Sequence, residues 1–121
     1  MAARVLIVDD ALFMRNMLKE IFIDGGYEVI GEAGNGIEAV ESYRRLQPDL
    51  VTMDIVMPLR SGIEALKEII DDDPAARVVM CSALGQESLI LEAVQAGARD
   101  FIVKPFKAER VLEVVGRVVA D

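Results

Sequence analysis

The chain has 121 residues, of which 53% are hydrophobic and 28% charged, a composition that fits one folded domain and excludes a disordered chain. Acidic residues outnumber basic ones by 21 to 13, and the formal charge of −8 argues against binding to nucleic acid or to an anionic membrane surface. The absence of histidine excludes histidine-based general-base catalysis, catalytic triads and zinc sites. We therefore expect a single domain spanning residues 1–121 whose direct partners are proteins.

Two further features bear on where the protein works. Cys81 is the only cysteine, so no disulfide can form within the chain. The apolar stretch before the acidic pair Asp9 and Asp10 is too short for the core of a signal peptide. We expect a cytoplasmic monomer with no segment inserted in a membrane.

Five short apolar runs rich in β-branched residues recur along the chain, each too short for a helix. Runs such as VLIV and VVM show no polar alternation, which is typical of strands covered on both faces in a parallel sheet. We therefore predict strands at 5–8, 27–30, 50–53, 77–81 and 100–103.

Apolar residues recur at helical spacing in the segments that follow each strand. Ser61 and Glu64 have the spacing of a capping box, and Gly97 follows the fourth periodic segment. A strand–helix unit repeated five times requires right-handed crossovers, so we predict an α/β fold, (βα)5, with a doubly wound parallel sheet. The residues expected on the buried helix faces are Met14, Met17, Leu18 and Ile21; Ile37, Val40 and Tyr43; Ile63, Leu66 and Ile70; Ile90, Ala93 and Val94; and Leu112, Val115 and Val119.

Polar side chains stand where the predicted strands end. Asp9 and Asp10 follow the first strand, while the third, fourth and fifth strands are followed by Asp54, Ser82 and Lys104. The carboxyl ends of parallel strands meet at one edge of the sheet, so these groups are expected to converge. Three converging carboxylates repel one another unless a cation neutralises them, and hard oxygen ligands favour Mg²⁺. The pattern predicts a divalent metal site.

The same set of groups suits phosphoryl chemistry. A carboxylate can attack a phosphoryl group while a metal ion, a lysine and a hydroxyl stabilise its oxygens. Each residue taken alone also has a plain structural interpretation, as a helix or turn cap, a strand-end hydroxyl or a solvated lysine. Their presence together at successive strand ends indicates a site for one ion and one phosphoryl group.

Three other features have structural interpretations. The segment GEAGNG has the spacing G-x-x-G-x-G and no P-loop lysine, so it is interpreted as a helix entry rather than a nucleotide loop. The methionines are expected to fill the core. Cys81 lies inside a predicted strand with no basic neighbour in sequence, which favours a buried and unreactive thiol.

Spaced motifs carry a resemblance to a known family: VLIVDD at 5–10, VTMDIVMP at 51–58 with Gly62 behind it, CSA at 81–83 and DFIVKPF at 100–106. Over essentially its whole length the chain resembles response-regulator receiver domains, specifically the stand-alone CheY-type regulators of chemotaxis. The resemblance implies a flavodoxin-like sheet with strand order 2-1-3-4-5.

The resemblance also implies that Asp54 accepts a phosphoryl group from a sensor histidine kinase of the CheA type. Asp10 and Asp54 would bind Mg²⁺ directly, and Asp9 would bind it through water. The backbone carbonyl of Val56 would supply a further ligand. In this scheme the protein is a regulator that assists its own phosphorylation and dephosphorylation, and not an enzyme acting on another substrate.

The roles in switching follow from the same resemblance. Lys104 would pair with the phosphoryl oxygens, and Ser82 would move to hydrogen-bond one of them. The Lys104–Pro105 peptide would be cis. Phe101 stands at the position of the family's switch aromatic, which packs inward once the hydroxyl has moved. Because Phe101 has no hydroxyl, it would mark the active state by packing alone.

In the family, partners bind the surface formed by the fourth helix, fifth strand and fifth helix. The resemblance implies a flagellar motor switch protein as the target, and it allows for a dedicated phosphatase. The residues that match positions used for motor binding are Ile90, Phe101, Val103 and Val114.

Val56 and Leu84 stand two residues after Asp54 and Ser82, where the family often has polar groups that tune hydrolysis. Three alternatives stay open. One is a relay intermediate that passes phosphate to a histidine phosphotransferase. Another is an aspartyl-phosphate phosphatase, although that family needs a second aspartate at the place of Val56. The third is a flavin-binding module of similar topology, in which the carboxylates would repel a phosphate that lacks a metal.

Overall fold

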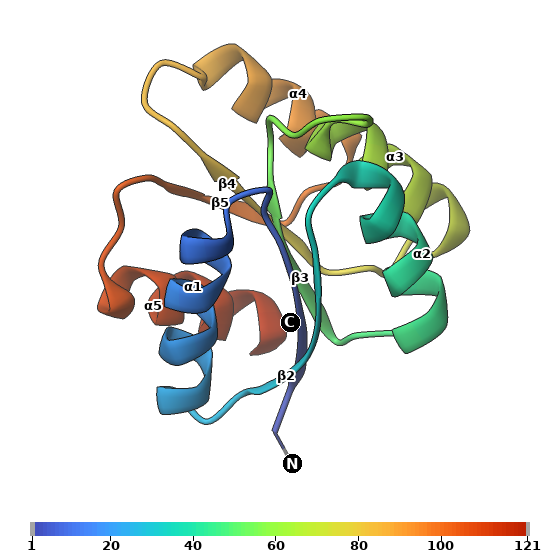
Figure 1. The fold of residues 1–121 in the computed structure, drawn as a ribbon. Helices are drawn as coiled ribbons and strands as arrows, with labels where there is room; N and C mark the ends of the chain where they lie inside the picture. The colour runs from blue at the N-terminus through green and yellow to red at the C-terminus, as the bar shows by residue number, and fades with distance from the viewer. Residues whose placement is uncertain (1, 121) are drawn as a thin grey trace.

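The computed structural model describes residues 2–120, which form a five-stranded parallel sheet (Figure 1). The strand order is β2-β1-β3-β4-β5, which is the order that the resemblance implies for a flavodoxin-like α/β fold. Every strand pair is parallel. The strands are β1 (Arg4–Val8), β2 (Glu28–Ala33), β3 (Leu50–Asp54), β4 (Val78–Ser82) and β5 (Asp100–Val103).

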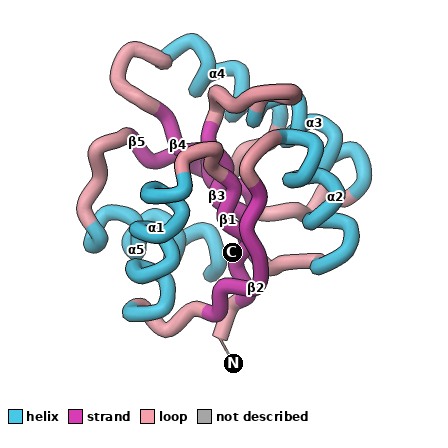
Figure 2. Tube along the Cα trace, in the orientation of Figure 1, coloured by secondary structure: helices cyan, strands magenta, loops and turns pink. Residues whose placement is uncertain are grey.

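Helices cover both faces of the sheet, as Figure 2 shows. The helices are α1 (Leu12–Asp24), α2 (Gly36–Leu46), α3 (Gly62–Asp72), α4 (Glu87–Ala96) and α5 (Ala108–Ala120). Helices α1 and α5 pack on one face, around Leu18 and Phe22, and α2, α3 and α4 pack on the other, around Met53 and Leu66. The sheet therefore separates two apolar clusters, which accounts for strands without polar alternation.

Strand β2 is longer than the predicted 27–30 and continues to Ala33. It is an edge strand of the sheet and, among residues 2–120, pairs only with β1, with a shift in register between Val5 and Leu6. The sequence predicts a helix entry at Gly31, but this residue lies in β2, where Leu46 of α2 packs against it. A Cβ at residue 31 would come within 2.6 Å of the Leu46 Cδ1 atom.

The helix signals in the sequence are confirmed. Ser61 and Glu64 form a complete capping box at the start of α3. The left-handed conformation after α4, which glycine adopts without strain, belongs to Gly97 with φ 118°. Gly36 begins α2, and Asn35 accepts a hydrogen bond from the Glu38 backbone N–H there. Within residues 2–120, no helix has the length and apolar character needed to cross a membrane.

Three residues expected in the core are exposed: Met17, Ile37 and Val94 have 42%, 42% and 46% of their surface accessible. Helical spacing places them near a buried stripe, but the sheet covers a narrower arc of α1, α2 and α4 than the pattern indicates. The remaining helix predictions include Leu18, Tyr43 and Leu66, all of which are buried.

The assignment of Val114 to a partner surface is wrong. Its side chain is fully buried in the cluster between α5 and the sheet. Together with Val111, Val115 and Val118 it makes the apolar stripe of α5, with the i, i+3, i+4 and i+7 spacing of a helix face that packs inward.

Candidate functional site

Asp54 is the last residue of β3, and its carboxylate is the centre of the candidate site. Only 13% of the side chain is exposed, and its Oδ1 atom lies 3.4 Å from the Nζ atom of Lys104. Burial raises the pKa of Asp54 to about 6, the charge of Lys104 opposes the shift, and the charges of Asp9 and Asp10 add to it. A carboxylate with a raised pKa at the end of a buried strand is typical of a functional group.

Asp9 follows β1 and is buried, with 1% of its side chain exposed. Its Oδ2 atom accepts a hydrogen bond from Lys104 Nζ at 2.9 Å, and its Oδ1 atom accepts one from the Ala11 backbone N–H at 2.9 Å. The Asp9 backbone N–H donates to the Ala33 carbonyl at the end of β2. The carboxylate is therefore held firmly on the inner side of the site.

Asp9, Asp10 and Asp54 each offer a carboxylate oxygen, and these three atoms lie within 4.8 Å of one another. Three carboxylates and the one ammonium group of Lys104 leave two negative charges, which a divalent cation would neutralise. Asp10 is exposed, so the cluster is open to solvent on that side. The residues present therefore fit a hard divalent cation such as Mg²⁺.

Lys104 follows β5, the edge strand next to β4, and its side chain reaches Asp9 and Asp54. Its backbone N–H donates to the Ser82 carbonyl at 2.7 Å, and the Lys104–Pro105 peptide is cis, as the resemblance implies. Burial acts to lower the pKa of Lys104, but the hydrogen bond to Asp9 and the charge of Asp54 outweigh it and hold the pKa above its usual value. The lysine is therefore a fixed positive charge between two carboxylates.

Ser82 is the last residue of β4 and is fully buried. Its Oγ atom has no hydrogen-bond partner among residues 2–120. A buried hydroxyl without a partner costs about 1–3 kcal/mol, so its persistence at a strand end points to a function. The next residue, Ala83, donates its backbone N–H to the Gln86 side chain at 2.7 Å.

The loop after β3 returns tightly to the site. Gly62 donates its backbone N–H to the Ile55 carbonyl at 2.8 Å, and a Cβ on Gly62 would lie 1.9 Å from the Asp54 carbonyl oxygen. Only glycine allows α3 to begin this close to the acceptor strand. Val56 and Leu84 project from the surrounding loops with 56% and 77% of their surface exposed.

Three of the four residues predicted for a partner surface lie together in the structure. Ile90, Phe101 and Val103 are half-buried and line one groove, together with Leu84 and Glu87. This groove lies between α4 and β5, and it begins next to the loop that follows Ser82. Three of the four predicted positions are therefore side by side, and Val114 is absent from them.

Cys81 is buried next to these groups, and its burial raises the pKa of the thiol to about 12. The prediction of a buried thiol is confirmed, and a raised pKa is consistent with the low reactivity that the sequence predicts.

The sequence analysis missed one group of charges beside the site. Arg15 donates from Nη1 to the Asp9 carbonyl at 2.6 Å and from Nε to Glu32 at 3.1 Å. Lys19 Nζ lies 2.5 Å from the other carboxylate oxygen of Glu32. The only sequence signal is the i, i+4 spacing of the two basic residues, because Glu32 lies 17 residues beyond Arg15, on β2.

Comparison with known proteins defines the class. The family model for the response regulator receiver domain matches residues 5–116. The chain belongs to the response regulator receiver domain family.

Relatives and solved structures narrow the class further. The chain is 59% identical to the chemotaxis protein CheY of Thermotoga maritima over 118 residues, covering 98% of each chain. It is also 59% identical to CheY of Bacillus subtilis, covering 98% of this chain and 99% of the relative. A chain in the crystal structure of the CheX–CheY–BeF3–Mg²⁺ complex from Borrelia burgdorferi matches with a TM-score of 0.92 and 43% identity, covering 96% of this chain and 88% of that one. The protein is thus a receiver domain of the CheY type.

Proposed function

We propose that the protein is a phospho-acceptor switch in which Asp54 receives a phosphoryl group from a CheA-like sensor histidine kinase in the cytoplasm. The observation that carries this proposal is the placement of the Asp54 carboxylate, 3.4 Å from Lys104 Nζ and within 4.8 Å of oxygens of Asp9 and Asp10. No single structural role accounts for a desolvated acid, a lysine and two further acids gathered at one sheet edge.

The transfer step uses the ionised form of Asp54. One carboxylate oxygen attacks the phosphorus atom of the phosphohistidine, the P–N bond breaks, and the imidazole nitrogen leaves and takes up a proton. Lys104 is placed to pair with the phosphoryl oxygens, and its ammonium group is already fixed by Asp9. The mixed anhydride that forms on Asp54 is the phosphorylated state.

The proposed metal ion is Mg²⁺, which would be held by the carboxylates of Asp10 and Asp54, by Asp9 through water, and by the backbone carbonyl of Val56. When bound, this ion would neutralise charge on the phosphoryl oxygens during transfer. The charge of the cluster and the presence of Mg²⁺ with BeF3 in the Borrelia burgdorferi complex support the assignment.

The switch depends on contacts that exist in only one state. Phosphorylation adds about two negative charges, to which the unpartnered Ser82 hydroxyl can donate a hydrogen bond. Movement of Ser82 would free space for Phe101, which lines the groove between α4 and β5. Because these contacts favour the phosphorylated state alone, they shift the population toward an active surface.

The output surface is the face of α4, β5 and α5, with Ile90, Phe101 and Val103 as its apolar contacts. The likeness to CheY supports a flagellar motor switch protein as the target, and a dedicated phosphatase would end the signal. The protein acts as a monomeric regulator and not as an enzyme on a separate substrate.

A relay intermediate that returns phosphate to a histidine phosphotransferase is the second candidate, since it needs the same acceptor site. An aspartyl-phosphate phosphatase is less well supported, because the exposed valine at position 56 replaces the second aspartate that such an enzyme needs.

The proposal is tested by incubating the protein with acetyl phosphate and Mg²⁺ and counting phosphoryl groups by mass spectrometry. We expect one phosphoryl group on the wild type, none on Asp54→Asn and none when EDTA removes the metal. Labelling of Asp54→Asn at the wild-type stoichiometry would contradict the assignment. Binding of the phosphorylated protein to a motor switch protein, against transfer to a histidine phosphotransferase, separates the two outputs.

A further inference from the structure

A chain of charged groups reaches the acidic cluster from the side of β2. Arg15 lies near the start of α1 and donates to the Asp9 carbonyl at 2.6 Å and to Glu32 at 3.1 Å. Glu32 lies on β2, one residue before Ala33, and its second oxygen is 2.5 Å from Lys19 Nζ. The side chains of α1 and β2 are thereby joined across the loop that carries Asp9 and Asp10.

The Asp9 carbonyl belongs to the peptide group that leads to Asp10, so the hydrogen bond from Arg15 orients that peptide. The other atoms of Asp9 are already held, by the Ala33 carbonyl, the Ala11 N–H and the Lys104 ammonium group. The Asp10 side chain is exposed, and its carboxylate depends on the backbone for its direction. A hydrogen bond from a guanidinium is stronger than one between neutral groups, which suits it to fix this peptide.

We propose that Arg15, held in place by Glu32, is a positioning residue for the divalent cation at Asp9, Asp10 and Asp54. This inference rests on the metal site of the proposed function. Arg15 acts through the Asp9 carbonyl rather than through a ligand carboxylate, and its side chain is 18% exposed, so packing restricts its motion. Glu32 serves to aim the guanidinium, because it binds the Nε atom while Nη1 reaches the carbonyl.

Charge alone predicts the opposite effect on metal binding. Arg15 places a positive charge near the cluster, so its removal would strengthen the attraction for a cation if only through-space electrostatics mattered. A positioning role predicts weaker binding, because the peptide between Asp9 and Asp10 loses its orientation. Groups that orient metal ligands from behind are typically worth tenfold to a hundredfold in metal affinity.

The test is a titration of the unphosphorylated protein with MgCl2 by isothermal calorimetry at constant ionic strength. We expect the Kd for Mg²⁺ to rise by about tenfold or more in Arg15→Gln. Lys107→Gln is the charge control, since it removes one positive charge from an exposed residue of the loop after β5 and leaves the link between Arg15, Glu32 and the Asp9 carbonyl intact. Its Kd is expected to stay the same or to fall slightly.

Arg15→Lys is a second variant, which keeps the charge but cannot reach Glu32 and the carbonyl at once with a planar fork. We expect its Kd to rise as well, and it decides the question if circular dichroism shows that Arg15→Gln is unfolded. Arg15 variants that bind Mg²⁺ as tightly as the wild type, and lose only thermal stability, would overturn the positioning role and leave the metal site intact. A wild type that binds no Mg²⁺ would overturn the metal site and this inference together.

Discussion

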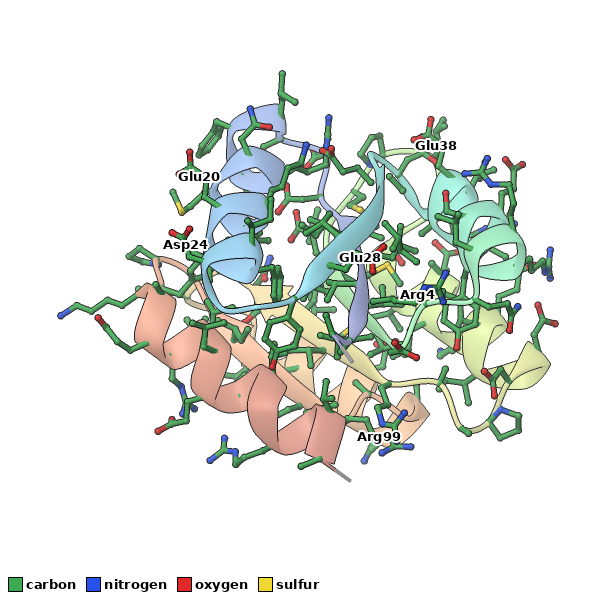
Figure 3. All side chains as sticks on the ribbon, turned by 90° about the horizontal axis from the view of Figure 1, so that it is seen from below. Arg4, Glu20, Asp24, Glu28, Glu38 and Arg99 are labelled. Atoms are coloured by element: carbon green, nitrogen blue, oxygen red, sulfur yellow. The ribbon has the colours of Figure 1, made fainter. Side chains whose placement is uncertain are left out.

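The two ends of the sheet, where the strands begin and where they end, differ in whether their polar groups have hydrogen-bond partners. At the edge where the strands begin, seen from below in Figure 3, the Arg4 guanidinium donates to the carbonyls of Leu46 and Gln47 at the end of α2. The Arg4 backbone N–H donates to Asp49 at 2.8 Å, and the Asp49 N–H donates to the Arg4 carbonyl in return. The polar groups of β1, the end of α2 and the following loop thus satisfy one another's hydrogen bonds.

Where the strands end, the Ser82 hydroxyl has no partner among the described residues 2–120, and Asp54 has a raised pKa. The same fold satisfies polar groups where the strands begin, as Arg4 demonstrates, so we attribute the unpartnered Ser82 hydroxyl and the raised pKa of Asp54 to function. Where the strands end, the carboxylates of Asp9, Asp10 and Asp54 repel one another, and a bound cation would relieve that repulsion.

The largest effect on stability is expected at Gly62, which packs closely against the backbone of Asp54 at the candidate site. Gly62→Ala places a Cβ 1.9 Å from the Asp54 carbonyl oxygen, and the atom in the way is backbone. We expect the free energy of unfolding, measured in urea, to fall by about 3 kcal/mol. Gly116→Ala is the control, because no atom of the described part of the chain lies within 4 Å of the added Cβ in α5, and its free energy of unfolding should rise by up to about 1 kcal/mol. Equal effects at the two glycines would contradict this account.

The next effect concerns the charge of Asp54. Its pKa is about 6 in the folded protein and 3.8 in its ordinary state, so folding favours the protonated form. In EDTA, the contribution of Asp54 to the free energy of unfolding is therefore most favourable below pH 4 and declines as the pH rises through 6. We expect Asp54→Asn to stabilise the protein by about 2 kcal/mol at pH 7.5 and by almost nothing at pH 4. A stability difference that does not change with pH would remove the electrostatic explanation.

A smaller loss is expected at the opposite edge. Arg4→Met removes two hydrogen bonds to the last carbonyls of α2, which should lower the free energy of unfolding by about 1–2 kcal/mol. The rate of phosphorylation by acetyl phosphate should not change, since Arg4 lies at the far edge of the sheet. Arg45→Met, on the exposed side of the same helix end, serves as the control for stability. A slower phosphorylation rate in Arg4→Met would show that the two edges are coupled.

The smallest change in stability is expected at two buried hydroxyls. Ser82 and Thr52 both have an oxygen without a partner among residues 2–120, and Thr52 lies two residues before the end of β3. Removing either oxygen, in Ser82→Ala or Thr52→Val, should stabilise the protein by at most about 1 kcal/mol. Only Ser82→Ala should alter the phosphorylated state, measured as a weaker affinity of the labelled protein for the motor switch protein that we propose as its target. The same loss of affinity in Thr52→Val would show that the effect comes from packing.

The sequence was sufficient to predict the fold class and the strand-end residues. Unalternating runs such as VLIV predict strands buried on both faces, and Asp54 and Lys104 converge because parallel strands end together. The strand order and the metal ligands came from the resemblance, since periodicity contains no information about which strands are neighbours.

The errors have physical causes. Val114 was placed on a partner surface by its match to the family, although its spacing with Val111 and Val118 predicts the buried face of α5. The link between Arg15 and Glu32 could not be predicted, because it joins residues 17 positions apart on a helix and an edge strand. Contacts of this kind depend on how α1 crosses β2, and no local pattern specifies that crossing.

The central claim is that burial and the neighbouring carboxylates make ionised Asp54 unfavourable, and that a bound cation would offset this cost. The direct measurement is an NMR titration of the aspartate side-chain carboxyl carbons, with and without Mg²⁺, using Asp54→Asn to assign the resonance. In EDTA we expect the Asp54 carboxyl to titrate near pH 6, and saturating Mg²⁺ should move that titration to lower pH. An Asp54 that titrates near its ordinary value of 3.8 in EDTA, and does not respond to Mg²⁺, would contradict the account.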